Sequence, residues 1–252
     1  TFTEVNNLNT GRSGIGSAGQ APQTAALGFG GYADPGGVQG KTESWNGSSW
    51  TEVADMNAIR GVITGAGTQP AALAIGGSPN DGTAQTAATE EWNGSAWTEI
   101  ADLNTARSRA TSSGTYTAAI ISGGNTPPAT AVTELWNGSA WTEVADLNTA
   151  RQQVQGSNAG TSTSTIVFGG SPPNRALTET WNGTAWTEDA DLATARAWGG
   201  GLGTSSSALM MGGYTTATVA TVEEFTRDAP VGAWASGGAM NTARYAVGAF
   251  GT

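Results

Sequence analysis

The feature that most constrains this chain is a unit of roughly 45 residues that recurs five times along it. Its clearest copy starts with Trp-Asn-Gly-Ser-Ala-Trp at Trp136 and runs to an arginine at Arg151. The same opening stands at Trp45, Trp92 and Trp181, and a more divergent copy starts at Phe225. A repeat of this length indicates a supersecondary unit that is stable only when packed against its neighbours.

Four landmarks recur in every copy. A Gly-Gly pair is found at residues 30–31, 76–77, 123–124, 169–170 and 212–213. A glutamate precedes the first aromatic residue by two positions, at Glu43, Glu90, Glu134, Glu179 and Glu223. A second tryptophan follows at Trp50, Trp97, Trp141, Trp186 and Trp234, with spacings of 47, 44, 45 and 48 residues. An arginine follows at Arg60, Arg107, Arg151, Arg196 and Arg244.

Each copy predicts four β-strands, and no segment has a helical period. In the third copy, residues 108–113 are the first strand, and 117–121 are the second, whose apolar run is typical of a strand buried on both faces. Residues 131–136 and 141–144 are the third and fourth. The Asn137-Gly138 pair between them predicts a tight hairpin in which both residues take φ > 0.

Four-stranded units of this length predict a β-propeller with one unit per blade. The order of Gly-Gly, aromatic, tryptophan and arginine resembles the kelch repeat over nearly the whole chain, although kelch repeats usually have Tyr where this chain has Trp or Phe. The resemblance implies a fold whose members mostly bind partners and only sometimes support an enzyme. We expect one all-β domain over 1–252 with five blades, at about 12–53, 60–100, 107–144, 151–189 and 196–236, and with small-residue first strands lining the central channel.

The two ends of the sequence duplicate one half of the repeat. Residues 1–10 match a fourth strand and the turn after it, and residues 241–252 match the start of a first strand. Three explanations are open: the chain is cut from a longer array, the spare strands form an incomplete sixth blade, or one end exchanges with a neighbouring chain. In the usual closure of a propeller, Phe2 to Val5 would be a latch that completes the last blade.

The composition limits the chemistry that the chain can support. It has no Cys and no His, which removes thiol and imidazole groups, and Lys41 is its single lysine. We therefore expect no cofactor and no metal site; the copper site of galactose oxidase, an enzyme with kelch repeats, needs His and Cys chemistry. The net charge of −10 argues against nucleic acid as a partner. No apolar run reaches the roughly 20 residues of a membrane helix.

Residues that repeat in every blade are better explained by architecture than by binding. We expect the tryptophan pairs to pack between blades rather than to form sugar platforms, and the repeat arginines to bond the repeat glutamates, nearby aspartates or loop carbonyls. Hairpin turns explain the glycosylation sequons at Asn46, Asn93, Asn137 and Asn182. Carboxylate pairs such as Glu90-Glu91 lie in strands, where neighbours point to opposite faces, so we expect no catalytic residue.

The copies differ most in the loops between the second and third strands. These loops and the fourth-to-first turns lie on one face of the propeller, opposite the Asn-Gly hairpins. Variable loops on a rigid scaffold are where recognition usually occurs. The candidate binding residues are Tyr32, Asp34, Asp81, Asn125, Arg175 and Tyr214, together with Trp198, which lies outside the repeat pattern near the channel.

The sequence thus favours a non-catalytic propeller that binds a protein or glycan partner through this face, as an adhesion or assembly module of an extracellular or virion surface. Its richness in Thr, Ser, Ala, Gly and Asn is similar to that of phage tail and bacterial surface repeat proteins. A multivalent lectin is the alternative, similar in plan to five-bladed tachylectin-type propellers with one sugar site per blade gap. A glycan-active enzyme is a third, less favoured reading. Homo-oligomers or larger assemblies are compatible with both binding readings.

Overall fold

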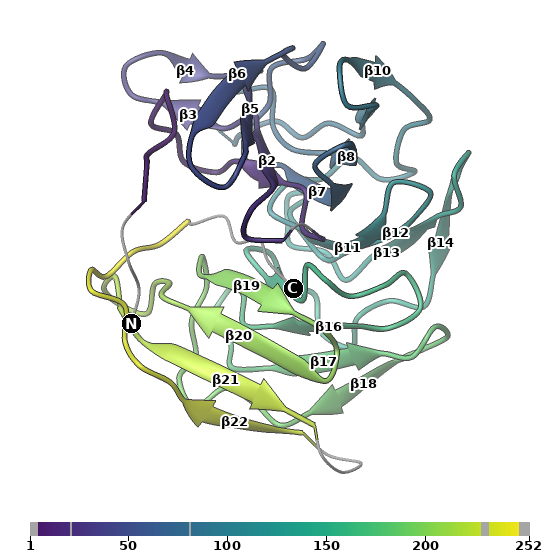
Figure 1. Cartoon of the computed structure of the whole chain (residues 1–252). Helices are drawn as coiled ribbons and strands as arrows, with labels where there is room; N and C mark the ends of the chain where they lie inside the picture. Colours follow the sequence, from purple (N-terminus) through teal and green to yellow (C-terminus); the bar gives the residue numbers. More distant parts are fainter. Residues whose placement is uncertain (1–4, 21, 81, 228–231, 247–252) are drawn as a thin grey trace.

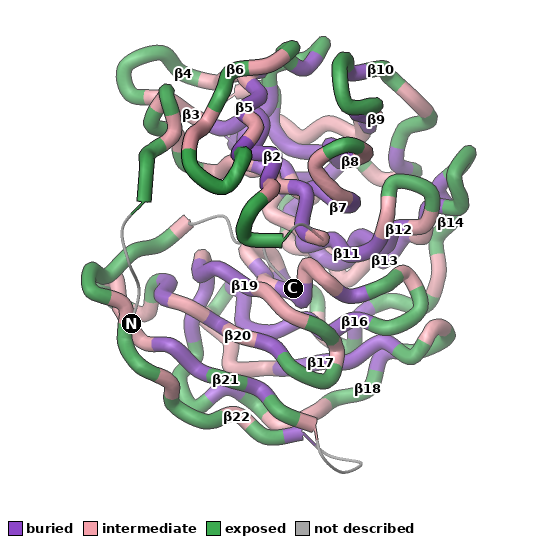
Figure 2. The backbone as a smooth tube through the Cα atoms, in the orientation of Figure 1, coloured by how far each residue is buried: buried purple, intermediate pink, exposed green. Residues whose placement is uncertain are grey.

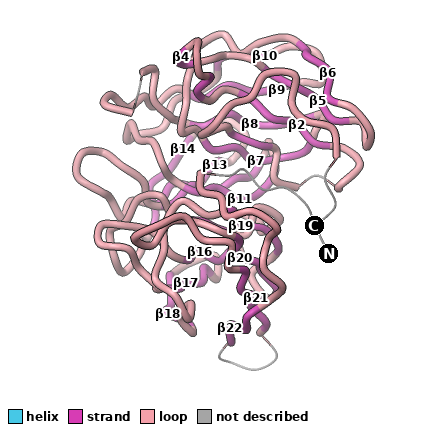
Figure 3. The backbone as a smooth tube through the Cα atoms, turned by 90° about the vertical axis from the view of Figure 1, so that its left-hand side faces the viewer, coloured by secondary structure: helices cyan, strands magenta, loops and turns pink. Residues whose placement is uncertain are grey.

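The computed structural model describes residues 5–20, 22–80, 82–227 and 232–246. Five four-stranded antiparallel sheets are arranged as the blades of a β-propeller (Figure 1), which confirms the predicted fold class. The described part of the chain has strands, turns and loops but no helix (Figure 3), so none of its segments forms a helix that could cross a membrane. The predicted latch lies outside the described residues, except for Val5.

Within each blade the four strands are neighbours in chain order. The first three blades are β1 (Gly16–Ser17), β2 (Ala26–Phe29), β5 (Thr42–Trp45) and β6 (Trp50–Val53); β7 (Thr64–Thr68), β8 (Ala71–Ile75), β9 (Thr89–Trp92) and β10 (Trp97–Glu99); and β11 (Thr111–Thr115), β12 (Ala118–Ser122), β13 (Thr133–Trp136) and β14 (Trp141–Val144). The last two are β15 (Gln155–Gly156), β16 (Thr165–Phe168), β17 (Thr178–Trp181) and β18 (Trp186–Asp189); and β19 (Gly200–Gly203), β20 (Ser207–Met211), β21 (Val222–Thr226) and β22 (Ala233–Ser236). A small hairpin of β3 (Tyr32–Ala33) and β4 (Gly37–Val38) extends the loop of blade 1.

The first strands form the inner wall of the propeller. Strands β1, β7, β11, β15 and β19 contact one another in that order, while β6, β14, β18 and β22 lie at the periphery (Figure 1). Their approach is close because the residues are small: a Cβ on Gly65 would lie 2.6 Å from the Ser17 carbonyl, and one on Gly201 would lie 2.7 Å from the Gly156 carbonyl. The small-residue pattern therefore reflects contact between neighbouring inner strands.

The hydrophobic core is divided into layers between blades, and the inner and middle strands are the most buried (Figure 2). Each layer receives the second tryptophan of one blade. The Trp97 ring packs edge-on against Phe29 of the preceding blade, with ring centroids 5.0 Å apart, and its Nε1 donates to Thr42 Oγ1 at 2.9 Å. Trp186 donates to Thr133, and Trp234 to Thr178, in the same way. These gaps are filled by protein side chains.

The Asn-Gly hairpins differ from the predicted two-residue turn. Trp136 pairs with Trp141 across a four-residue loop, in which only Gly138 has a positive φ, of 94°. The Asn137 side chain accepts the N–H groups of Ser139 and Ala140 at 2.9 and 3.0 Å. The prediction of φ > 0 at both residues is wrong, because the asparagine caps the turn through its side chain rather than through a left-handed backbone.

The first strands also start later than predicted. In the third copy β11 begins at Thr111 rather than directly after Arg107, because Arg109 has a φ of 58° and interrupts the extended backbone. Strands β12 and β13 are shifted or shortened by one or two residues, and β14 matches its predicted range.

A buried arginine organises each blade junction. The Arg60 side chain donates to Glu90 at 2.8 Å and to the carbonyls of Gly76 and Ala88, and the Arg60 carbonyl accepts the N–H of Gly31 from the preceding blade. Burial lowers the pKa of this guanidinium, and the charge of Glu90 opposes that shift. The same ion pair joins Arg107 to Glu134, Arg151 to Glu179 and Arg196 to Glu223.

Near the two ends of the chain, the arginines that form this ion pair differ from those predicted. Arg12, which the sequence analysis left out of the set, pairs with Glu43 at 2.8 Å. Arg244, which was included, has an exposed side chain with no carboxylate partner among the described residues, although its carbonyl accepts the Gly213 N–H at 2.8 Å. Blade 1 already has its own arginine, so Arg244 faces the open junction between blade 5 and blade 1. We call this junction the seam; it holds a cavity of about 560 Å³.

We predict that Trp97→Ala lowers the free energy of unfolding by about 3–5 kcal/mol, because the ring is 6% exposed and fills the layer between blades 1 and 2. Trp50→Ala is the matched control, since Trp50 holds the same repeat position but is half-buried beside the seam. Urea melts of both variants test this, and equal losses would contradict the assignment.

We predict that Arg107→Met costs about 3–5 kcal/mol of unfolding free energy, because Glu134 would remain buried without its counter-charge. Arg244→Met, at the same repeat position, should change stability by no more than about 0.5 kcal/mol because its side chain is exposed. Denaturant melts at neutral pH compare the two, and a loss below 1 kcal/mol for Arg107→Met is the contrary result.

Candidate functional site

Six residues with left-handed backbone surround the end of the channel on the loop face. Each stands two positions after a repeat arginine, and together they form what we call the axial ring: Gly14, Val62, Arg109, Gln153, Trp198 and Ala246. Their φ angles lie between 43° and 62°. Five of the six are not glycine, and a β-branched residue such as Val62 is strained in this region.

Backbone hydrogen bonds link successive members of the axial ring. The N–H of Arg109 donates to the Val62 carbonyl at 3.1 Å, and that of Gln153 donates to the Arg109 carbonyl at 2.8 Å. Trp198 then donates to Gln153 at 3.4 Å, and Ala246 to Trp198 at 2.6 Å. The left-handed turn gives each blade one N–H and one carbonyl directed along the ring, so the shape of the ring is independent of its side chains.

A second set of residues lies just outside the axial ring. The residue after each Gly-Gly pair forms a β-bridge with the residue after each repeat arginine: Tyr32 with Ser13, Ser78 with Gly61, Asn125 with Ser108, Ser171 with Gln152, and Tyr214 with Ala197. The bridge fixes the loop to the start of the first strand. Within each blade, the loop after the Gly-Gly pair is therefore held next to the axial-ring residue.

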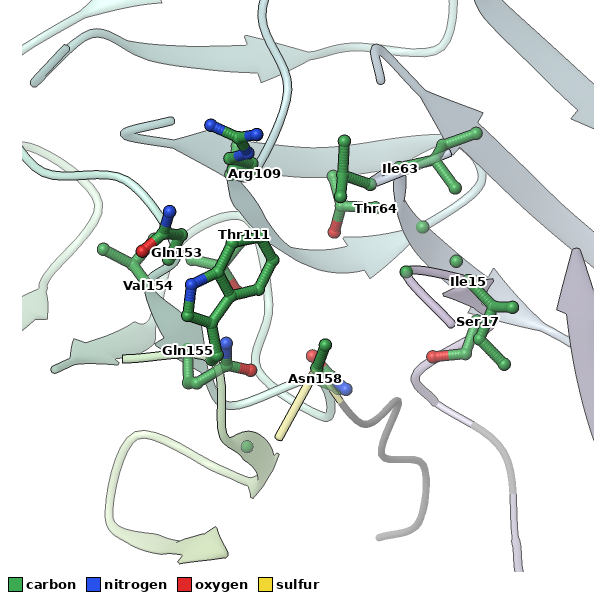
Figure 4. A pocket seen from close by; sticks show the side chains of 18 of the residues that line it. Ile15, Ser17, Ile63, Thr64, Arg109, Thr111, Gln153, Val154, Gln155 and Asn158 are labelled. Carbon is green, nitrogen blue, oxygen red and sulfur yellow. The ribbon is translucent and has the colours of Figure 1, made fainter. Parts of the chain in front are cut away.

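The axial ring opens into a cavity of about 110 Å³ along the channel. Its wall carries hydroxyl and amide groups from four blades, including Ser17, Thr64, Thr111, Gln155 and Asn158 (Figure 4). Toward the opposite face, blades 1 and 4 meet across the channel. A Cβ on Gly19 would lie 2.5 Å from Asn158 Cβ, and Gln20 Nε2 donates to the Gly160 carbonyl at 2.9 Å. The channel is therefore narrow at that end.

Among the described residues that line this cavity, Arg109 is the one that carries a charge. Its guanidinium carbon lies 5.6 Å from the centroid of the Trp198 ring, a cation–π contact, and its Nη1 donates to the neutral Gln152 Oε1 at 3.3 Å. By contrast, carboxylates pair with Arg12, Arg60, Arg107, Arg151, Arg196 and Arg227. The mouth of the cavity thus has a positive charge that no carboxylate of the described chain neutralises.

The loop candidates from the sequence occupy several different environments. Trp198 lines the cavity, and Tyr214 is 42% exposed and packs against Tyr245, with ring centroids 6.4 Å apart. Tyr32 donates from its hydroxyl to the Asn80 carbonyl at 2.6 Å, and Asn125 is buried in its β-bridge.

Two further candidates are not brought to the cavity. Asp34 is exposed on the loop that joins β3 to β4, and Arg175 is half-buried where its carbonyl accepts the Arg196 N–H. Asp81 lies outside the described residues.

The sequence analysis did not identify Arg109, Gln153 or Val62, although the signal was present. Aligning the copies on the repeat arginine places these residues in one column with Gly14, Trp198 and Ala246. That column differs in every copy, whereas the columns that lead up to the arginine repeat. Its functional meaning depends on the left-handed backbone and on the convergence at the axis, which only the structure displays.

The repeat carboxylates are engaged elsewhere. Glu90 accepts the Asn57 N–H at 2.7 Å in addition to its arginine bond, and Glu134 accepts that of Asn104 at 2.8 Å. Within the described part of the chain, no three acidic side chains gather in a way that could hold a metal ion.

Comparisons with known proteins support the fold alone. No protein-family model and no curated protein matches the sequence. Among solved structures, the chain is similar to the one titled "Structure of YjhT", with a TM-score of 0.73 and 16% sequence identity over 89% of this chain and 84% of that chain. At this identity the similarity shows a shared propeller fold.

We predict that Val62→Gly leaves the free energy of unfolding unchanged or raises it by up to about 1 kcal/mol, because it removes left-handed strain of about 1–2 kcal/mol at the expense of backbone entropy. Val167→Gly, in the buried strand β16, is the control and should be strongly destabilising. Thermal and urea melts of both variants measure these changes in unfolding free energy. A loss of more than about 1 kcal/mol for Val62→Gly would show that the side chain is held by packing.

Proposed function

We propose that this chain is a non-catalytic binding propeller that recognises its partner at the axial ring and the surrounding loops. The observation that carries the proposal is the divergence of side chains at six equivalent, left-handed positions around one cavity. Strained backbone that persists across a structure often marks a functional site. The repeated residues, by contrast, are occupied in junctions between blades.

The chemistry of the cavity favours a partner that presents a carboxylate. Arg109 supplies a positive charge in a chain of net charge −10, and Trp198 offers an aromatic face beside it. A guanidinium recognises a carboxylate through two parallel hydrogen bonds. The partner is then an acidic group on a protein or glycan, and the negative net charge disfavours nucleic acid.

A lectin is the second candidate function, and the uncharged polar side chains in the wall of the cavity support it. Hydroxyl and amide side chains such as Thr64, Gln155 and Asn158 suit the hydroxyls of a sugar, and Trp198 suits the apolar face of its ring. In this reading the sugar binds once, on the axis, because the tryptophans fill the blade gaps that the sequence analysis considered.

The composition supports a place at an extracellular or virion surface, where such a module would serve adhesion or assembly. The absence of an enzyme function is part of the same proposal. It is supported by the engagement of the repeat carboxylates in arginine bonds and by the lining of the cavity, which includes no acidic residue of the described chain.

We predict that a glycan array and a panel of acidic peptides will identify a carboxylate-bearing ligand whose affinity falls at least about tenfold in Arg109→Gln and in Trp198→Ala. Ser139→Ala, on the opposite face, is the control and should bind like the unmodified chain. Calorimetry of the best ligand gives the stoichiometry, expected to be one per chain.

Two results would contradict this assignment. One is a ligand whose binding is unaffected by both variants, which would place recognition elsewhere. The other is several equivalent sites per chain, which would favour the multivalent lectin of the blade gaps. Turnover of a glycan that is lost on substitution of a single carboxylate would overturn the non-catalytic reading.

A further inference from the structure

The Asn-Gly hairpins, on the face opposite the axial ring, hold two reactive groups that the fold leaves unbonded. In the third blade, Asn137 is exposed and is followed by Gly138. Neither Asn137 Nδ2 nor the N–H of Gly138 has a hydrogen-bond partner in the described part of the chain. Gly138 has a φ of 94° and no Cβ, so no side chain of its own shields its nitrogen.

The oxygen of the same side chain is held by three donors. Asn137 Oδ1 accepts the N–H of Ser139 at 2.9 Å, the Ser139 hydroxyl at 2.9 Å and the N–H of Ala140 at 3.0 Å. When a nucleophile attacks a carbonyl carbon, negative charge develops on the carbonyl oxygen, and fixed donors around that oxygen stabilise it. The turn therefore surrounds this amide oxygen with the donor set of an oxyanion hole.

Asparagines at the blade junctions are equally exposed but have these groups engaged. Asn104 Nδ2 donates to Glu134 Oε2 and to the Trp141 carbonyl, both at 2.9 Å. The N–H of Thr105, the residue that follows, donates to Glu134 Oε1 at 3.2 Å. Asn57 is held in the same way at the preceding junction. The junctions thus bind the amide nitrogen and the next backbone nitrogen, which the hairpin leaves free.

We propose that the Asn-Gly turns are sites of self-modification, at which the side-chain amide of the asparagine is converted to a carboxylate. The Gly138 nitrogen gives up its proton to solvent and bonds to Asn137 Cγ, while negative charge builds on Oδ1. The Cγ–Nδ2 bond then breaks and Nδ2 leaves as ammonia, which yields a five-membered succinimide. Water opens this ring at Cγ to give aspartate, or at the main-chain carbonyl to give isoaspartate, so one water is consumed for each ammonia released.

The four turns differ in the groups that this reaction uses. Asn93 has the same three donors as Asn137, at 2.9–3.0 Å. Asn182 Oδ1 accepts two backbone N–H groups and, within the described chain, no hydroxyl. At Asn46 the oxygen has its donors, but the leaving Nδ2 donates to Ser49 Oγ at 3.3 Å. We therefore expect Asn93 and Asn137 to react faster than Asn46 and Asn182.

The modification changes the charge of one face and leaves the rest of the propeller in place. Conversion of all four turns adds four negative charges to the net charge of −10. Isoaspartate also inserts a methylene into the main chain of the turn. The buried arginine–glutamate pairs and the axial ring lie outside these hairpins, so the blade junctions and the candidate site keep their contacts.

The first experiment incubates the folded chain in mildly alkaline buffer below its melting temperature. Peptide mapping by tandem mass spectrometry at successive times gives the fraction of each asparagine that has become aspartate or isoaspartate. We expect Asn93 and Asn137 to convert at least about tenfold faster than Asn57 and Asn104, the matched junction asparagines of the same chain. An unconverted Asn137, or equal rates at the hairpins and the junctions, overturns the proposal.

A second arm tests the donor set, because Ser139→Ala removes one donor to Asn137 Oδ1 and keeps the Asn-Gly sequence. In the folded chain we expect this variant to convert Asn137 at least about threefold more slowly, while Asn93, whose donors are unchanged, keeps its rate. In urea above the unfolding transition, the variant and the unmodified chain should convert Asn137 at the same rate. Equal rates at Asn137 in the two folded chains overturn the proposal, and so does a difference that persists in urea.

Discussion

The buried arginine–glutamate pair is the interaction on which the rest of the propeller depends. One arginine joins three segments: its carbonyl holds the Gly-Gly turn of the preceding blade, its guanidinium holds the glutamate of its own blade, and that glutamate holds the loop that leads to the arginine. A buried ion pair adds little net stability, because desolvation offsets the attraction, but breaking one is costly. The main effect of the pair is therefore to fix how neighbouring blades align with each other, rather than to add stability. The position of the arginine carbonyl also explains why the first residue of each Gly-Gly pair is glycine. A Cβ on Gly76, for example, would lie 2.5 Å from the Arg107 carbonyl oxygen.

Much of this framework could be predicted from the sequence. Five copies in register predicted the blades, and in the third copy, for which strand ranges were predicted, the middle and outer strands fall close to those ranges, because buried apolar runs and tryptophan pairs are strong local signals. The first strands were harder to place, since Thr, Ser and Gly carry little pattern and a left-handed residue delays each start. The Asn-Gly turns were located correctly but given the wrong conformation, because Asn137 can act through its side chain or its backbone and the sequence does not distinguish the two.

The candidate site was predicted less completely. Trp198 stood out because it is large and breaks the pattern, and it does line the cavity. Arg109 did not stand out, since an arginine two residues after Arg107 suggests one more surface cation. Its importance depends on three facts that belong to the folded chain: its backbone is left-handed, its blade brings it to the axis, and no acidic side chain of the described chain lies near enough to pair with it. The sequence did not separate loop residues such as Asp34 from residues near the axis, because loop length does not report distance from the axis.

The position of the axial ring follows from the constraint that near-identical blades impose. Four blade junctions share the same buried pairs, so any site built in one gap would be repeated in the others and would have little room to differ. At the axis the blades converge on one cavity, and each contributes one residue from a backbone position that is held by backbone hydrogen bonds. A substitution there changes the cavity without disturbing a junction. Divergence among glycine, valine, arginine, glutamine, tryptophan and alanine in that column is therefore tolerated by the fold, and under the proposed function it is the means by which a symmetric scaffold would obtain one asymmetric binding site.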